Sequence, residues 1–243
     1  MPFRLLNLEA VAEYLHLTVQ DVEQRVKDRE IPFEKRGDRI VFRKGEIDAW
    51  ASQRILGFSS QGLTDYHQKS TRRRRKILEQ ETILPEMLKV GAIASAMSSK
   101  TKASVLRDLV ALAEKTGHLN DPKTLLASLE AREELCPTAM PGGLALPHPR
   151  SHEPYLFETS FIVVGRPIQE IHFGAPDGQP TYLFFLICCQ DDRLHLHTLA
   201  RICLLAQKTK ILEQLRDAPD AQTMRDSLIA AEQEILADRR IVP

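Results

Sequence analysis

The first fifty positions of the chain contain apolar residues at helical spacing and two short runs of β type. Asn7 and Thr18, side chains that begin helices well, each precede a run in which apolar residues recur every three to four positions. Two short β-type runs then flank a Gly37-Asp38 turn, and another helical run starts at Lys44. The pattern predicts helices at 8–15, 18–26 and from 44 onward, with a hairpin wing formed by 33–35 and 39–42.

The second half of the chain alternates helical and strand patterns. Asp121-Pro122 is a helix cap followed by a proline in the first turn, which marks the start of one helix clearly. The expected helices are 105–113, 122–132, 196–206, 211–215 and 224–236, and the expected buried strands are 161–164 and 182–189. Strands interleaved with helices predict an α/β sandwich with a mixed β-sheet, larger than the N-terminal unit.

The distribution of charge divides the chain into three parts. The 243 residues are 43% hydrophobic and 27% charged, with zero net charge, as expected for packed domains. Residues 1–56 hold ten Lys+Arg and ten Asp+Glu, residues 57–84 hold six and three, and residues 85–243 hold 17 and 20. We therefore predict an N-terminal domain (1–56), a basic linker (57–84) that contains the run Arg72–Lys76, and a second domain (85–243). The linker run is either a phosphate-contacting segment or a solvated helix face.

Several classes of protein do not fit the composition. The longest apolar runs, such as Tyr182–Cys189, are too short to cross a bilayer, and the N-terminus lacks a signal-peptide pattern. Four cysteines without framework spacing indicate a reduced, cytoplasmic setting. Phosphate-binding P-loops, dinucleotide fingerprints and metal-ligand spacings do not occur, so we predict neither a cofactor nor a metal site.

One stretch, 132–149, concentrates the candidate chemistry. It passes from a charged helix end through Gly142-Gly143 and a short apolar strand to His148, which lies between Pro147 and Pro149. Each proline fixes its own φ and pushes the preceding residue toward extended backbone, so the imidazole is held on both sides. A held imidazole can serve as a nucleophile, a general base or a metal ligand, or it can be a turn histidine without a role.

This stretch resembles the active-site motif of the type-2 enzyme IIA domains of the bacterial phosphoenolpyruvate-dependent phosphotransferase system, which include mannitol, fructose and nitrogen-regulatory members. The residues that carry the resemblance are Arg132-Glu133, Thr138, Gly142-Gly143, Leu144–Leu146 and Pro147-His148. Two later stretches, Ile171–Pro180 and His195-Leu-His-Thr-Leu199, also resemble the family. Three motifs in the family's order make the resemblance specific, and the α/β sandwich that it implies agrees with the pattern above.

The resemblance implies a role for each residue. His148 would accept a phosphoryl group, Arg132 would meet its oxygens with a planar guanidinium, and His195 would donate a hydrogen bond to it. Phosphate-binding groups would be the Thr138 hydroxyl and the backbone amides of Gly142 and Gly143. The family usually has glycine after the active histidine, whereas this chain has Pro149, which removes a backbone N–H.

The N-terminal pattern resembles the excisionase and MerR-like winged-helix family of DNA-binding domains. The matching residues are Leu8–Leu15, Thr18–Val26, Ile31-Pro32, Gly37 and Ile47–Trp50. The expected DNA-contacting residues are Gln20, Gln24, Arg25, Lys35, Arg36, Arg39 and Arg43, and Lys44 adds to the positive charge of the wing. Because the domain has no net charge, a winged helix that contacts a protein is the alternative.

Together these features predict a cytoplasmic regulator related to nitrogen-regulatory enzyme IIA, a phosphohistidine phosphoryl-transfer component rather than an independent turnover enzyme. Its expected partners are the histidine-phosphocarrier protein of the same relay and DNA. The oligomeric state stays open, a homodimer included. The alternative function is a non-catalytic DNA-binding or protein-interaction scaffold whose enzyme IIA-like domain is silent.

Overall fold

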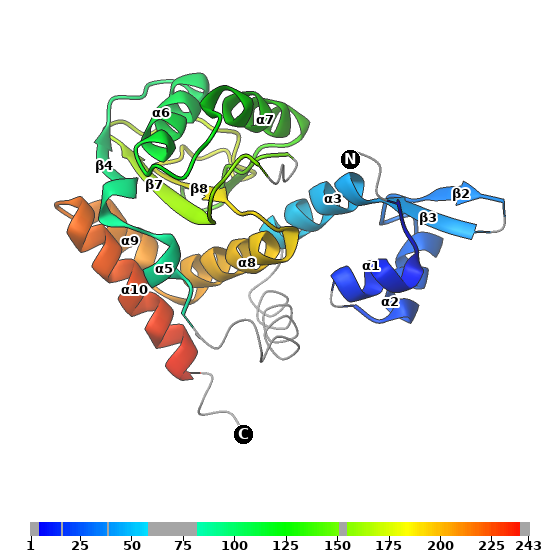
Figure 1. Cartoon of the computed structure of the whole chain (residues 1–243). Coiled ribbons are helices and arrows are strands. Elements are labelled where there is room, and N and C mark those ends of the chain that lie inside the picture. The colour runs from blue at the N-terminus through cyan, green and yellow to red at the C-terminus, as the bar shows by residue number, and fades with distance from the viewer. Residues whose placement is uncertain (1–4, 16, 38, 58–81, 151–154, 239–243) are drawn as a thin grey trace.

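The computed structural model describes residues 5–15, 17–37, 39–57, 82–150 and 155–238 (Figure 1). A small N-terminal domain and a larger α/β domain meet through two long helices, α3 and α8. The basic run 72–76 of the predicted linker lies outside the described residues. No helix within the described ranges is long and apolar enough to cross a membrane.

The N-terminal domain is a winged helix-turn-helix. Helices α1 (Leu8–Tyr14) and α2 (Val19–Lys27) are joined by a short turn, and α2 begins with a capping box between Thr18 and Asp21. Strands β1 (Leu5–Leu6), β2 (Glu34–Arg36) and β3 (Arg39–Arg43) form an antiparallel sheet in the order β1-β3-β2. Helix α3 (Lys44–Leu56) follows β3 directly.

The α/β domain is built on a five-stranded mixed sheet in the order β4-β7-β8-β6-β5. Its strands are β4 (Ile93–Met97), β5 (Ala139–Met140), β6 (Leu144–Ala145), β7 (Phe161–Pro167) and β8 (Leu183–Cys188). The central pair, β7 and β8, is antiparallel, whereas β4 is parallel to β7 and β6 is parallel to β8. Strand β6 leads directly to His148, so the sheet positions the candidate histidine.

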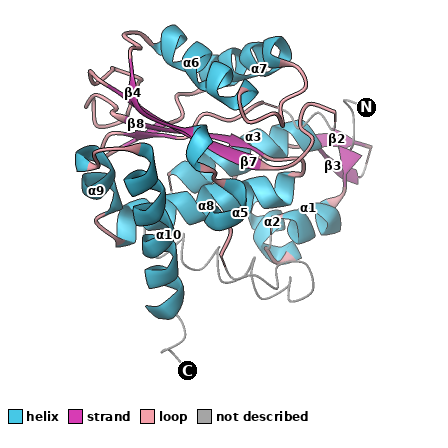
Figure 2. Ribbon diagram, turned by 60° about the vertical axis from the view of Figure 1, so that its left-hand side comes forward, coloured by secondary structure: helices cyan, strands magenta, loops and turns pink. Residues whose placement is uncertain are grey.

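Helices cover both faces of this sheet (Figure 2). Helices α6 (Lys102–Glu114) and α7 (Pro122–Leu135) lie on one face. The other face carries α5 (Leu84–Met87), α8 (Asp192–Lys208), α9 (Ile211–Asp217) and α10 (Ala221–Asp238), and the 3-10 turn η1 (Val90–Ala92) precedes β4. Successive side chains of β7 and β8 point to opposite faces and are buried on both, as the continuous apolar runs of these strands predict.

The two domains share one apolar core. Buried side chains of the N-terminal domain, such as Val11 and Ile47, belong to the same cluster as Leu196 and Leu199 of α8. At the edge of this junction the Lys44 ammonium forms ion pairs with Asp192, in the first turn of α8, and with Asp48. This corrects the assignment of Lys44 to the positive charge of the wing, because its side chain faces the α/β domain.

The sequence pattern located most of these elements. The expected helices and the two central strands are confirmed, and the predicted fold class agrees with the structure. Strands β1, β4 and β5 were not predicted, because they are short or carry alanine and serine where a strand pattern needs apolar alternation. Ile83 and Leu84, placed by sequence at the end of the linker, are buried and donate backbone hydrogen bonds to Glu232 of α10.

Candidate functional site

The loop after β6 holds His148 from several directions. The Leu146 amide donates to the Thr138 carbonyl (3.1 Å), and the Ile187 amide of β8 donates to the Pro147 carbonyl (3.0 Å). The side chain of His148 is only 2% exposed. Main-chain hydrogen bonds at the two preceding residues and the two flanking prolines therefore fix the direction of the imidazole, as the sequence pattern predicted.

Two hydrogen bonds define which nitrogen of His148 carries the proton. Nδ1 lies 2.8 Å from the Leu146 carbonyl oxygen, which can only accept, so Nδ1 must be the protonated nitrogen. Nε2 lies 3.1 Å from Nε of Arg132, which can only donate, so Nε2 presents its lone pair. The neutral ring with a basic Nε2 is the form of histidine that can act as a nucleophile.

Arg132 reaches His148 from the last turn of α7. It is 3% exposed, and its second contact is a 2.8 Å hydrogen bond from Nη1 to the Cys136 carbonyl at the end of the helix. Burial lowers the pKa of the Arg132 guanidinium, but arginine stays charged at neutral pH. A guanidinium thus lies beside Nε2 of His148, in a position suited to bind an anion.

His195 lies on the opposite side of His148. It belongs to the first turn of α8, is 2% exposed, and its ring centroid is 4.8 Å from that of His148 at a tilt of 49°. Its Nε2 is 3.4 Å from the Ser52 hydroxyl of α3. The structure therefore brings Arg132, His148 and His195 together, as the sequence predicted; their roles stay predictions. His197, two residues further along α8, is also buried.

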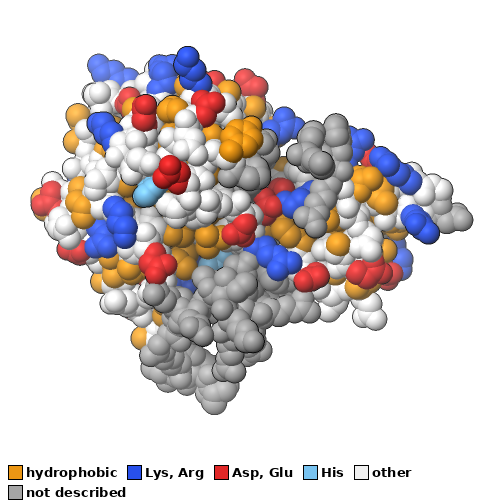
Figure 3. Space-filling view, in the orientation of Figure 1, with side chains coloured by type: hydrophobic (Ala, Val, Ile, Leu, Met, Phe, Trp, Pro, Cys, Tyr) orange, Lys and Arg blue, Asp and Glu red, His pale blue; other side chains and the backbone are white. Residues whose placement is uncertain are grey.

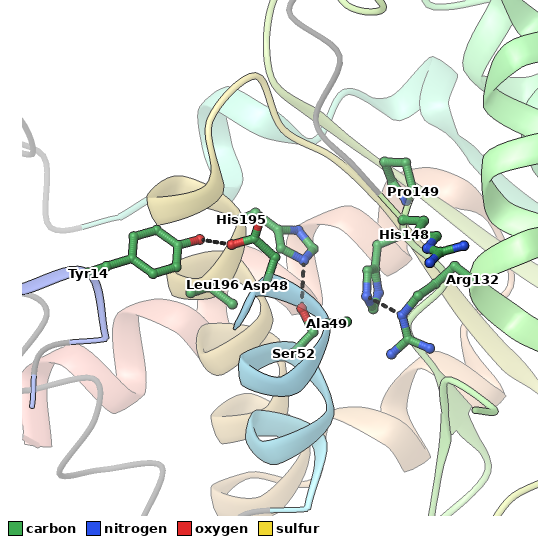
Figure 4. A pocket seen from close by; sticks show the side chains of 10 residues that line it. Tyr14, Asp48, Ala49, Ser52, Arg132, His148, Pro149, His195 and Leu196 are labelled. Carbon is green, nitrogen blue, oxygen red and sulfur yellow. Dashed lines mark hydrogen bonds between the residues drawn. The ribbon is translucent and has the colours of Figure 1, made fainter. Parts of the chain in front are cut away.

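The N-terminal domain forms one wall of the site. Figure 4 shows that Ser52 of α3 points toward His195, and that Asp48, one turn earlier, points toward Tyr14 of α1. Ala49 lines the same cavity, whose opposite wall is formed by Arg132, His148, Pro149, Arg150, His195 and Leu196. The cavity that these residues leave is about 10 Å³, which is room for about one water molecule.

The three predicted phosphate-binding residues lie before β6, because Thr138 precedes β5 and Gly142 and Gly143 form the turn between β5 and β6. The Thr138 hydroxyl and amide both donate to the buried Glu133 carboxylate, at 2.6 and 2.9 Å. The Gly142 amide donates to Asp177 (3.2 Å), and the Gly143 backbone packs against Tyr182. All three residues shape the segment that leads to His148 but do not line its cavity, so their part in phosphate binding stays a prediction.

Pro149 lies in the cavity wall, at the position where the family usually has glycine. The next amide, that of Arg150, donates to the Ser128 hydroxyl of α7 (3.0 Å). The chain after His148 is therefore anchored to α7 and does not present a main-chain donor at residue 149.

The predicted DNA-contacting residues lie on α2 and the wing. Lys35, Arg36, Arg39 and Arg43 are exposed, and Figure 3 shows Lys and Arg side chains where β2 and β3 lie. Glu34 forms ion pairs with Arg36 (3.4 Å) and with Arg43. On α2, Gln20 is exposed. Gln24 bonds to Asp28, and Arg25 forms an ion pair with Glu30.

Three residues of the site had no signal in the sequence. Tyr14, Asp48 and Ser52 belong to the N-terminal pattern, and Ser52 is 143 positions from His195. Their helical spacing marked them as parts of a winged helix, not as neighbours of an imidazole. The alternative that the winged helix contacts a protein came nearest to predicting this contact with the α/β domain.

The mixed sheet between two helical layers, with a fixed histidine between an arginine and a second histidine, defines a domain of the phosphotransferase-system enzyme IIA type. Residues 86–231 match the family described as "Phosphoenolpyruvate-dependent sugar phosphotransferase system, EIIA 2", and the chain belongs to this family. Residues 5–55 match a helix-turn-helix domain.

Relatives with curated functions fall into two groups. The "Nitrogen regulatory protein" of Escherichia coli (strain K12) is 31% identical over 139 residues, which are 56% of this chain and 82% of that protein. The protein of the same name from Pseudomonas aeruginosa is 26% identical over 58% of this chain and 91% of its own length. The "PTS system fructose-specific EIIABC component" of Bacillus subtilis is 28% identical over 145 residues, but the match spans only 22% of its length.

Solved structures show the same fold. The nitrogen regulatory protein IIA-Ntr of Neisseria meningitidis superposes with a TM-score of 0.53 and 25% identity, covering 60% of this chain and 99% of that structure. The IIA mannitol structure of Escherichia coli gives a TM-score of 0.52 at 18% identity, covering 58% and 98%, and supports the fold alone.

Proposed function

We propose that this protein is a phosphorylation-dependent regulator in which Nε2 of His148 accepts a phosphoryl group from a histidine-phosphocarrier protein. The N–P bond on the carrier breaks as a new N–P bond forms on Nε2, so the phosphoryl group is exchanged between two imidazoles. The observation that carries the proposal is the tautomer of His148, because the Leu146 carbonyl holds the proton on Nδ1 and leaves Nε2 basic.

The surrounding side chains would stabilise the phosphorylated form. The new group adds nearly two negative charges, and Arg132, already 3.1 Å from Nε2, can turn to pair with them. His195 can donate a hydrogen bond from the other side of the ring. Partial shelter from water would slow hydrolysis of the N–P bond.

Regulation fits the comparisons better than sugar uptake. The match covers most of the length of the nitrogen regulatory proteins but only 22% of the fructose-specific component. The helix-turn-helix domain adds a module of the kind that contacts DNA, with α2 for the major groove and the wing for the phosphate backbone. We therefore propose that phosphorylation of His148 regulates what this module binds.

Phosphorylation is tested by incubating the full chain with phosphoenolpyruvate, the first enzyme of the relay and the phosphocarrier protein. We expect one acid-labile, alkali-stable phosphoryl group per chain, absent in His148→Ala and retained in His172→Ala, which changes an exposed histidine. A wild-type chain that stays unlabelled would instead favour the silent scaffold.

DNA binding is tested by retention of a DNA duplex at increasing salt concentrations. Arg36→Ala plus Arg39→Ala should weaken retention and reduce its dependence on salt, because both positions lie on the exposed wing. The matched control, Arg107→Ala plus Lys123→Ala, removes two exposed cations of the α/β domain and should leave retention unchanged. Equal losses in both variants would count against an interface on the wing.

A further inference from the structure

We infer that helix α3 of the winged-helix domain occupies the surface on which the phosphocarrier protein must dock, so that α3 contact and phosphorylation of His148 exclude each other. The inference rests on the proposed function and assigns a regulation to the same site. Within this chain, the partner of the phosphorylation site would be its own winged-helix domain.

Helix α3 limits the access of a donor protein to His148. An imidazole that receives a phosphoryl group from another protein must meet the donor histidine directly, yet the His148 and His195 side chains are each 2% exposed. The wall that closes the cavity on one side comes from the N-terminal domain, through Asp48, Ala49 and Ser52 (Figure 4). Removal of α3 would open that side of the cavity.

The space beside His148 is small compared with a phosphoryl group. The space beside His148 that these walls leave is about 10 Å³, enough for about one water molecule. A phosphoryl group adds one phosphorus and three oxygen atoms, and Nε2 of His148 faces Arg132 at hydrogen-bond distance. A phosphoryl group on Nε2 would therefore crowd the side chains of α3 that line this space.

The Asp48 carboxylate of α3 would lie near the negative charge of a phosphohistidine. Asp48 lines the cavity and accepts hydrogen bonds from Tyr14 (2.6 Å) and Lys44 (3.1 Å). A phosphohistidine would place nearly two negative charges in the same small space. Repulsion between the two anions favours separation of the domains, so phosphorylation would release α3 and, with it, the winged-helix domain.

The polar contacts at the rim of the junction between α3 and the α/β domain are suited to reversible opening. Lys44 pairs with Asp192, and both side chains are partly exposed, at 23% and 17%. Gln53 of α3 contacts the Cys136 thiol (3.5 Å), and the exposed Arg193 pairs with Glu13 of α1 (3.5 Å). These polar contacts at the rim exchange readily for water, whereas separation of the domains also exposes apolar side chains of the shared core, such as Ile47 and Leu199.

The first test changes Lys44 in the full chain. Lys44→Glu places a carboxylate beside Asp48 and Asp192, so the interface should open and phosphoryl transfer should become about tenfold faster, within the range typical of coupling between two sites. Adding Asp192→Lys should bring the rate back toward that of the wild type. Lys27→Glu is the matched control: it reverses an exposed charge at the end of α2 and should transfer at the wild-type rate.

The second test locks the domains together. Gln53→Cys places a thiol near Cys136, and a short bis-maleimide should link the two. The other cysteines are buried, and burial raises the pKa of the Cys203 thiol to about 12 and of Cys188 and Cys189 above their usual range, so they react slowly. The linked chain should not be phosphorylated, whereas the same variant capped with N-ethylmaleimide should be.

The results separate this inference from the proposed function. If the linked chain and the wild type are phosphorylated at the same rate, and Lys44→Glu does not accelerate transfer, the inference is wrong while the proposed function stands. If Lys44→Glu, Gln53→Cys and the wild type all stay unlabelled, the proposed function fails and the inference falls with it.

Discussion

Helix α8 forms one ion pair from its middle and one from its first turn, and the two pairs differ in kind. In its middle, Arg201 is 2.5 Å from Glu232 of α10, and both side chains are at most 2% exposed. At its first turn, Asp192 pairs with Lys44 of the N-terminal domain, and both side chains reach water. One helix thus carries a fully buried ion pair and one that reaches water, and we infer that only the second can separate.

The difference follows from what surrounds each carboxylate. Glu232 also accepts hydrogen bonds from the backbone amides of Ile83 and Leu84, each at 3.0 Å. This buried carboxylate therefore has these hydrogen-bond donors only in the folded domain. Asp192 can exchange its partner for water at little loss of free energy. The comparison predicts that substitutions at the buried pair unfold the domain, whereas substitutions at the exposed pair change the contact between domains.

The largest effect on stability is expected for Glu232→Ala. It removes the carboxylate that pairs with the buried Arg201 guanidinium and accepts two backbone amides, and should lower the free energy of unfolding by about 3–5 kcal/mol. Urea denaturation measures this loss. The matched control is Glu234→Ala, an exposed position of the same helix, and comparable losses in both variants would mean that the buried pair has no special part in the fold.

A smaller loss is expected for Gly143→Ala, in the loop that leads to His148. Gly143 has a φ of +82°, and an added Cβ would lie 2.2 Å from Cε1 of Tyr182. Strain and displacement of the ring should together cost about 1–3 kcal/mol. Gly178→Ala controls for backbone strain alone, because Gly178 has a φ of +70° and open space where the methyl group would lie. The prediction fails if Gly178→Ala costs as much as Gly143→Ala.

The smallest loss is expected for Lys44→Ala. It removes a partly exposed ion pair and should change the free energy of unfolding by less than about 1 kcal/mol. The same variant should show faster amide hydrogen exchange in α3 than the wild type, because contact with α8 is weakened. Unfolding of the whole α/β domain at lower urea would show that this junction is as permanent as the buried one.

The sequence predicted the fold well where a local pattern is compatible with only one kind of structure. Asn7, Thr18 and Asp121 mark helix starts because their side chains bond to free amides, and the apolar runs of β7 and β8 admit few other structures. The residues Arg132, His148 and His195 were found through a motif that fixes local geometry. Strand β4 was missed, since Ile-Ala-Ser-Ala-Met has no alternation of apolar and polar positions.

The contact between domains could not be predicted from the sequence. Ser52 and Asp48 lie on a helix whose apolar positions serve the winged-helix core, and nothing local says what covers its other face. Lys44 was assigned to a basic wing because its neighbours in sequence are basic, yet its partners are Asp48 and Asp192. Long-range pairing of this kind depends on the packed structure, not on spacing.

The most direct test of the account is nuclear magnetic resonance of the phosphorylated full chain labelled with ¹⁵N. Two-bond proton–nitrogen correlations of the histidine rings report which ring nitrogen carries phosphorus. The account predicts a phosphoryl group on Nε2 of His148, with Nδ1 protonated, together with shifts of α3 resonances that indicate loss of its contact with α8. A phosphoryl group on Nδ1, on another side chain, or on His148 with α3 undisturbed would contradict it.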